Sequence, residues 1–280
     1  MRLLAMATAT IIAVSTPQAL AWGSYGHSAV AMIAESLLTP QAKENVRKLL
    51  LGAPLVTGAA FADEYRVGHP ETSRWHYVDI PDDQTNYDAA RDCEVTIEGD
   101  CTIAAIEREG HLILDPEAGV FGRADALKRL VHWVGDIHQP FHATERIVDG
   151  EPDAGGNEFR LRFFDAPSGN NTNMHALWDT GLLMREDRYV EDLVQDLTTN
   201  VVPGIPVAEA DETDPVEWAL SSHSVAHDAY FADVAGTTEV IDQVYIDNNL
   251  PIAKRQLALA GIHLAMILNE LLVDPHPAGF

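Results

Sequence analysis

The chain has 280 residues, of which 46% are hydrophobic and 22% charged, so it is long enough to close a hydrophobic core of its own. Its formal net charge of −25 argues against nucleic-acid binding by composition alone, because proteins that bind polyanions usually present a basic face. Bound divalent cations can reverse the charge locally, so a nucleic-acid site has to be argued from its residues.

The first 21 residues have the pattern of a secretory leader. Arg2 precedes an apolar run over residues 3–14, and Ala19-Leu20-Ala21 has the small-x-small arrangement that signal peptidases cut. The run is short for a membrane anchor, and no second such segment follows. We therefore expect a signal peptide over residues 1–21, an exported protein that is periplasmic or secreted, and one domain over residues 22–280 that begins with Trp22.

Apolar residues recur at helical spacing in seven segments of the mature chain. These segments are 28–38, 41–51, 102–114, 124–136, 185–197, 215–231 and 249–272. Only residues 158–164 alternate like a strand, and the stretches 149–157 and 166–173 are rich in glycine and asparagine, as loops or a hairpin rim are. The sequence predicts an all-α fold with one small β-hairpin.

Cys93 and Cys101 are the only two cysteines, and they flank a short acidic stretch that contains a glycine. In an oxidising compartment they could close a small loop, so a disulfide is favoured. A pair of metal-binding thiols is the alternative, but the spacing is loose and no Cys-x-x-Cys partner exists.

Two His-x-x-x-Asp pairs stand out among the twelve histidines. His132 and Asp136 lie four apart on an expected helix, and His175 and Asp179 repeat the spacing, so each pair projects from one helix face. A lone pair of this kind is more often a surface contact. Two pairs together with His142 offer five ligands of the types that zinc prefers, which is enough for more than one metal ion.

Three further candidates lie upstream: Asp63, His76, and His27, which follows Trp22 by five residues. With this ordered set the chain resembles the S1/P1 nuclease family, whose mature chains begin with a tryptophan that binds zinc through its amino nitrogen and carbonyl oxygen. The resemblance implies the helical phospholipase C/P1 nuclease-like fold over residues 22–280, with the ordered motifs running from Trp22 to Asp179.

The resemblance also implies three zinc ions (Zn2+) per monomer. The first zinc would be held by Asp63, His76, His132 and Asp136. The second would be held by His142, His175 and Asp179. The third would be held by Trp22 and His27, with Asp136 as a bridging carboxylate.

The implied activity is hydrolysis of single-stranded DNA and RNA to 5′-phosphorylated products by an activated bridging water, and 3′-nucleotidase activity is left open. A cluster of zinc ions suits this chemistry because it lowers the pKa of bound water and neutralises charge on phosphate oxygens. Asp63 would orient the attacking water, and Arg66 would stabilise the growing charge of the phosphate. The alternative for Arg66 is a surface salt bridge with Asp63 or Glu64.

Tyr77, Asp79 and Asn157 match the positions that bind the base in the family, where an unpaired base can stack on an aromatic ring. Tyr77 could equally fill the core, and Asp79 could cap a turn. Residues 143–154 and 158–174 are longer than expected of the family and flank the pocket. The implied partners are single-stranded DNA, RNA and mononucleotides, bound by a monomer without stable membrane association.

Two other functions compete with the nuclease. A zinc-dependent phospholipase C has the same fold and N-terminal tryptophan, but that family typically ends its ligand set with His-x-x-x-Glu, whereas this chain has Asp179. An inactive, metal-sequestering protein is the alternative from a different class. The strong acidity is compatible with it, and the intact ligand set argues against it.

Overall fold

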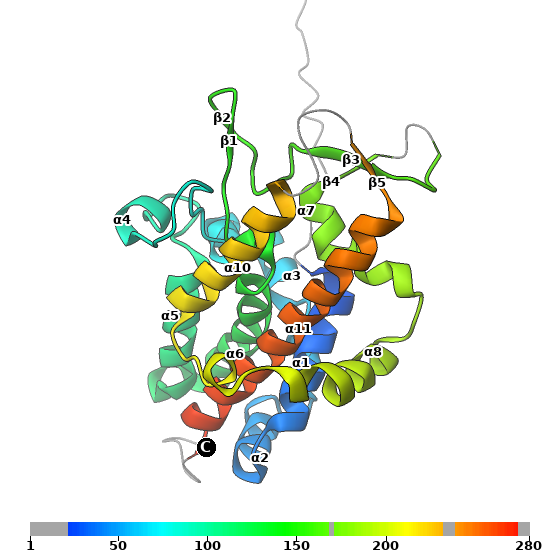
Figure 1. Cartoon of the computed structure of the whole chain (residues 1–280). Coiled ribbons are helices and arrows are strands. Elements are labelled where there is room, and N and C mark those ends of the chain that lie inside the picture. Colours follow the sequence, from blue (N-terminus) through cyan, green and yellow to red (C-terminus); the bar gives the residue numbers. More distant parts are fainter. Residues whose placement is uncertain (1–21, 168–170, 232–238, 274–280) are drawn as a thin grey trace, which may run out of the picture.

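The computed structural model describes residues 22–167, 171–231 and 239–273, and the expected leader lies outside these residues. Helices make up most of the described chain, and short strands gather at one end of them (Figure 1). The predicted helical class is therefore confirmed. No helix in the described part of the chain is long and apolar enough to cross a membrane.

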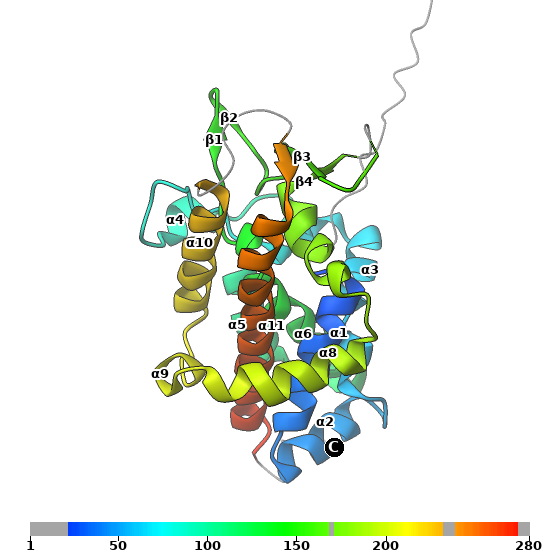
Figure 2. The same ribbon diagram turned by 45° about the vertical axis from the view of Figure 1, so that its right-hand side comes forward.

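Three buried helices form the centre of the fold: α1 (Gly23–Leu37), α6 (Gly119–Ile137) and α11 (Gln243–Leu271). The α1 helix packs along α11, and α6 packs along α5 (Thr102–Leu114). Figure 2 shows α8 (Val190–Asp196) lying across α1, in front of it. Four tryptophans are fully buried in this core: Trp22, Trp133, Trp178 and Trp218.

The remaining helices surround this centre. The first of them, α2, starts where the sequence predicts, because the Thr39 side chain accepts a hydrogen bond from the Ala42 amide and Pro40 occupies the first helical turn. The surrounding helices are α2 (Pro40–Leu49), α3 (Phe61–Gly68), α4 (Ala89–Asp92), α7 (Met174–Ala176), α9 (Val207–Ala210) and α10 (Pro215–Phe231).

Short 3₁₀ and π segments connect these helices, and several of them carry functional candidates. The 3₁₀ segments are η1 (Leu55–Gly58), η2 (Pro70–His76), η3 (Pro116–Ala118), η4 (Pro140–His142), η6 (Leu183–Glu186) and η8 (Val202–Gly204). The π segments are η5 (Leu177–Gly181) and η7 (Leu197–Val201).

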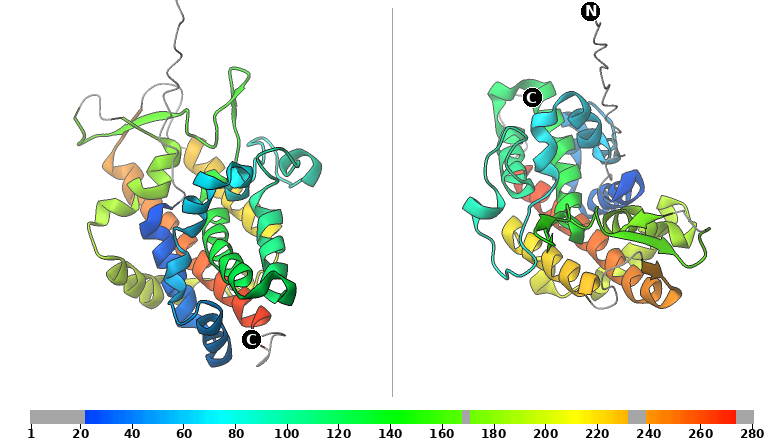
Figure 3. Two further views of the ribbon diagram at one scale, coloured as in Figure 1. Left: turned by 180° about the vertical axis from the view of Figure 1, so that it is seen from behind. Right: turned by 90° about the horizontal axis from the view of Figure 1, so that it is seen from above.

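Two small sheets lie at the same end of the molecule (Figure 3). The antiparallel pair β1 (Ile147–Val148) and β2 (Glu151–Pro152) forms a hairpin. In the second sheet, β3 (Arg160–Phe163) pairs antiparallel with β4 (Thr172–Asn173) and parallel with β5 (Glu239–Ile241). The sequence predicts one hairpin, and the additional sheet depends on a partner strand far along the chain.

Cys93 and Cys101 form the disulfide that the sequence favours over a pair of metal-binding thiols. The bond closes a loop between α4 and α5. Within the loop, the amides and carbonyls of Thr96 and Gly99 pair with each other, so the closed segment folds back on itself.

Candidate metal centre

Histidine and aspartate side chains converge in three groups at the end of the molecule where α1 begins and α6 ends. Within each group, the ligand atoms lie within 4.8 Å of one another. All eight predicted side-chain ligands are included. The groups are His27, His132 and Asp136; Asp63, His76 and His132; and His142, His175 and Asp179.

Each ligand occupies a fixed place in an element. In both predicted His-x-x-x-Asp pairs, the two side chains point to the centre. The first pair lies in the last turns of α6, and the second spans α7 and the π segment η5. Short 3₁₀ segments end on His76 and His142, where the chain turns back, while Asp63 lies in the first turn of α3. Residues far apart in sequence therefore meet through the packing of α1, α3 and α6.

Asp136 faces histidines of two groups, and His132 is the member that these two groups share. One carboxylate oxygen, Oδ1, lies 3.2 Å from His27 Nε2, and the other, Oδ2, lies 2.9 Å from His76 Nδ1 and 3.4 Å from His132 Nε2. The side chain is fully buried. Because its two oxygens face different histidines, this carboxylate has the position that a bridging ligand needs.

His142 and His175 form the third group with Asp179. The Nδ1 atoms of the two rings lie 2.7 Å from the His76 carbonyl and 2.8 Å from the Gly155 carbonyl, and a carbonyl can only accept, so each Nδ1 carries a proton. In neutral rings both Nε2 atoms are then bare, yet they lie 3.0 Å apart. Two lone pairs pointing at each other call for a cation between them.

Further atoms at the centre also fit a metal ion. His132 donates from Nδ1 to the Ala59 carbonyl at 2.7 Å, which turns Nε2 inward, as metal-binding histidines commonly do. Its Nε2 and the carboxylate atoms Asp136 Oδ1 and Asp179 Oδ2 are buried and make no hydrogen bond within the described residues. Buried polar atoms without partners are costly, and coordination would satisfy them.

Burial shifts the pKa values of the histidines and aspartates at this centre. Burial lowers the pKa of His76 and His142 well below the usual histidine value, and lowers that of His175 to about 4. It raises the pKa of Asp136 and Asp179 well above the usual value for aspartate. Neutral imidazoles are the form that binds metal, and nearby cations would stabilise the buried carboxylates as anions.

Trp22 and His27 lie where α1 approaches α6. The Trp22 indole is buried and donates from Nε1 to the Gly135 carbonyl at 2.9 Å. The His27 ring stacks on His132, with ring centroids 3.9 Å apart. Trp22 and the first turns of α1 are thus fixed beside the candidate metal ligands.

Arg66 lies one helical turn beyond Asp63 and pairs with it. Their Nη2 and Oδ1 atoms are 3.2 Å apart, and both side chains are largely buried. A salt bridge with Asp63, which the sequence offered as an alternative, is therefore present, but it is largely buried and not at the surface. Its carboxylate partner belongs to the metal centre, so the arginine also lies at the edge of that centre.

A pocket of about 190 Å³ opens beside the third ligand group. It brings together the three predicted base-binding residues, Tyr77, Asp79 and Asn157, with the ligand His175. The segment 143–154, which is longer than expected of the family, contributes Thr144, Glu145 and Ala154 to the lining. Burial raises the pKa of Tyr77 to about 12 and that of Asp79 to about 6.

Gln139, to which the sequence alone assigns no role, orients a candidate ligand. Its buried amide donates from Nε2 to Asp179 Oδ1, and its Oε1 accepts from the Phe141 amide. The available signal was its position between two ligands in the run Asp136-Ile137-His138-Gln139-Pro140-Phe141-His142. The neighbouring His138 instead bonds to the Val134 carbonyl and to His263, away from the centre.

The chain belongs to the S1/P1 nuclease family. The sequence model described as S1/P1 Nuclease matches residues 22–273, which include every residue of the centre. The protein is accordingly an S1/P1-type endonuclease.

Several similar proteins carry nuclease names. Endonuclease 4 of Arabidopsis thaliana is 30% identical over 281 residues, covering 90% of each chain. Nuclease P1 of Penicillium citrinum is 27% identical over 278 residues, covering 89% of this chain and 97% of its own. Nuclease S1 of Aspergillus oryzae is 27% identical over 283 residues, covering 91% and 93%.

Proposed function

We propose that the mature protein hydrolyses single-stranded DNA and RNA to 5′-phosphorylated products with three zinc ions per monomer. The observation that carries the proposal is the convergence of histidine and carboxylate ligand atoms around Asp136 and between His142 and His175. Membership of the S1/P1 nuclease family supports the same reaction.

The proposed ligand sets use all the residues of the three groups together with Trp22. The first zinc would be held by Asp63, His76, His132 and Asp136; the second by His142, His175 and Asp179; and the third by Trp22, His27 and Asp136. When bound, the ions supply a lowered pKa for water and positive charge for the phosphate oxygens.

The side chains around the ligands have distinct tasks in this proposal. Asp63 accepts a hydrogen bond from the attacking water, and Arg66 offers its remaining N–H groups to the phosphate as negative charge grows there. Tyr77, Asp79 and Asn157 hold the base of the nucleotide in the adjoining pocket. The pocket admits a base only when it is unstacked and unpaired, which is the reason for expecting single strands.

The strong acidity of the chain is compatible with this substrate. The net charge of −25 repels polyanions, so binding has to rely on the metal centre and Arg66 as local positive charge. We propose that the leader over residues 1–21 directs export and that the mature protein acts as a monomer, without stable membrane association.

The proposal is tested by measuring zinc per monomer and hydrolysis of single-stranded DNA on protein that begins at Trp22. We expect about three zinc ions and release of 5′-nucleotides that a chelator abolishes and zinc restores. Duplex DNA of the same sequence is the matched control substrate. Release of diacylglycerol from phosphatidylcholine in place of nucleotides would redirect the assignment to a phospholipase, and full zinc occupancy without hydrolysis would indicate a metal-sequestering protein.

A further inference from the structure

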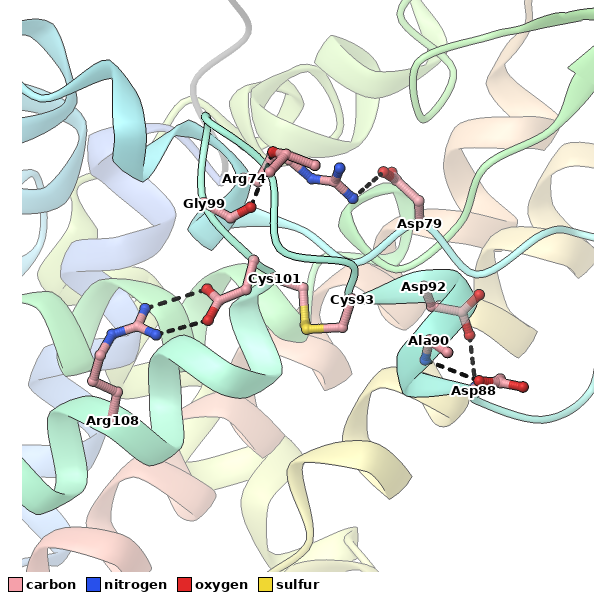
Figure 4. The surroundings of a disulfide bond; sticks show 11 residues. Arg74, Asp79, Asp88, Ala90, Asp92, Cys93, Gly99, Cys101 and Arg108 are labelled. Atoms are coloured by element: carbon pink, nitrogen blue, oxygen red, sulfur yellow. Dashed lines mark hydrogen bonds and ion pairs between the residues drawn. A yellow bond between two sulfur atoms is a disulfide. The ribbon is translucent and has the colours of Figure 1, made fainter.

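The loop closed by the disulfide lies against the segment that carries the base-pocket residues (Figure 4). The Arg74 amide donates to the Glu98 carbonyl of this loop at 3.1 Å. At the end of the loop, the Thr102 amide donates to the Tyr77 carbonyl at 3.0 Å. Backbone hydrogen bonds therefore hold the chain on both sides of the ligand His76. One is made with Glu98 in the loop, and the other with Thr102, which directly follows the loop.

Side-chain packing also holds the loop against the segment that carries the base-pocket residues. Gly99 has a φ of +107° and lies against Trp75, where an added Cβ would come within 2.4 Å of the indole Nε1. Only glycine combines this backbone conformation with so close an approach. Arg108 covers the Trp75 ring at 4.1 Å and pairs with Asp100 of the loop at 2.8 Å.

Arg74 reaches from this anchored backbone to a pocket residue. Its Nη2 lies 3.5 Å from Asp79 Oδ2, and the two side chains are 18% and 32% exposed. Burial and the nearby Asp92 raise the pKa of Asp79, and the Arg74 cation opposes that rise. The pair thus favours an ionised Asp79 with one oxygen engaged and the other available in the pocket.

We propose that Arg74 is a positioning residue for base recognition, held in place by the disulfide-closed loop over residues 93–101. It holds the Asp79 carboxylate so that the free oxygen accepts a hydrogen bond from an N–H donor on the base. All the nucleotide bases offer such a donor, and guanine offers both a ring N–H and an exocyclic amino group. This inference rests on the proposed function only in taking the pocket beside His175 as the base site.

Binding distinguishes this role from direct contact between Arg74 and phosphate. Calorimetry on the zinc-loaded mature protein would compare 5′-dGMP with inorganic phosphate for the wild type and for Arg74→Gln and Arg74→Lys. We expect Arg74→Gln to weaken 5′-dGMP about tenfold, to leave phosphate unchanged, and to be partly rescued by lysine. Unchanged 5′-dGMP affinity, or equal losses for both ligands, would overturn the proposal.

Kinetics supply a second readout. For a deoxyguanosine dinucleotide, KM should rise about tenfold in Arg74→Gln while kcat changes less than about twofold, and bis(p-nitrophenyl) phosphate, which has no base, should be cleaved as by the wild type. Arg47→Gln, at an exposed position of α2 at the opposite end of the molecule, is the matched control (Figure 1). A loss confined to kcat would contradict a positioning role.

The loop is tested with Cys93→Ser/Cys101→Ser, which should shift binding of 5′-dGMP in the same direction as Arg74→Gln but by less. Intact affinity for 5′-dGMP in this variant would remove the loop from the proposal. If the wild type binds 5′-dGMP but hydrolyses no phosphodiester, the proposed function fails, and the binding comparison still decides the role of Arg74.

Discussion

The histidines of the metal centre differ in the ring nitrogen that they turn inward. His132, His142 and His175 donate from Nδ1 to backbone carbonyls and present Nε2, whereas His76 presents Nδ1 to Asp136. The carbonyl partners belong to residues 59, 76 and 155, which no spacing rule connects to their histidines. The sequence therefore indicates that these residues are ligands, but the ligating atom depends on the fold.

Glu145 shows how burial changes a carboxyl group in the pocket wall. It accepts from the Ala154 amide at 2.9 Å and is hydrogen-bonded to Asp153. Burial first, and then the negative charges of Asp79 and Asp153, raise its pKa to about 8. Between pH 4.5, the ordinary pKa of a glutamate, and about pH 8, the folded protein therefore retains this proton, whereas the unfolded chain has lost it.

We expect the stability of the protein to fall as pH rises from about 4.5 to about 8, and Glu145→Gln to reduce that fall, because a neutral amide has no proton to lose. The measurement is the free energy of unfolding in urea across this range, with the exposed Glu158→Gln as control. Parallel pH curves for the wild type and Glu145→Gln would contradict the raised pKa.

At the scale of elements, helices with local signals are where the sequence predicts them. The segments 102–114 and 215–231 coincide with α5 and α10, and the predicted boundary between the segments 28–38 and 41–51 separates α1 from α2. The expected helix over 185–197 differs, because Asp187 adopts a left-handed conformation and α8 begins only at Val190. Glu186, just before this break, pairs with Lys254 of α11, a contact that the local sequence does not reveal.

The approach of α1 to α6 depends on Gly135. A Cβ added at Gly135 would lie 2.6 Å from His27 Nδ1. The Gly135 carbonyl also accepts a hydrogen bond from the Trp22 indole. We expect Gly135→Ala to displace His27, to cost about 1–3 kcal/mol of stability and to lower zinc content by removing the third ion first. Unfolding in urea and metal analysis of the purified protein would measure both effects.

Gly122 provides the control on the same helix. The nearest atom to an added Cβ is 3.5 Å away, an ordinary contact. Gly122→Ala should therefore keep all the zinc and gain up to about 1 kcal/mol from the higher helix propensity of alanine. Equal zinc contents in the two variants would show that close packing at Gly135 is not needed for the third ion.

At the scale of the whole molecule, the buried ligands couple metal binding to stability. Without cations, the fold has to bury Asp136 and Asp179 among histidines whose nitrogens converge. At free zinc of about 100 times Kd, binding contributes about 2.7 kcal/mol, and a protein of this size shifts its Tm by about 2–4 °C per kcal/mol. We expect chelation to lower Tm by roughly 5–10 °C.

Differential scanning calorimetry before and after chelation would measure this change, with zinc added back to test reversibility. Magnesium is the control ion, because it prefers oxygen ligands and should not restore the original Tm. An unchanged Tm in protein shown to have lost its zinc would contradict coupling between the centre and the fold.

The helical class and the pairing of Cys93 with Cys101 could be predicted from local periodicity and from the presence of only two cysteines. Helical spacing indicated the two His-x-x-x-Asp pairs, whereas the resemblance to the S1/P1 nuclease family supplied the full set of ligand candidates. The contacts of Asp136 with histidines of two groups, of Gln139 with Asp179 and of Arg74 with Asp79 emerge only in the folded structure. Each of these contacts depends on how distant helices and loops pack, because burial and charge act between residues that are neighbours in space.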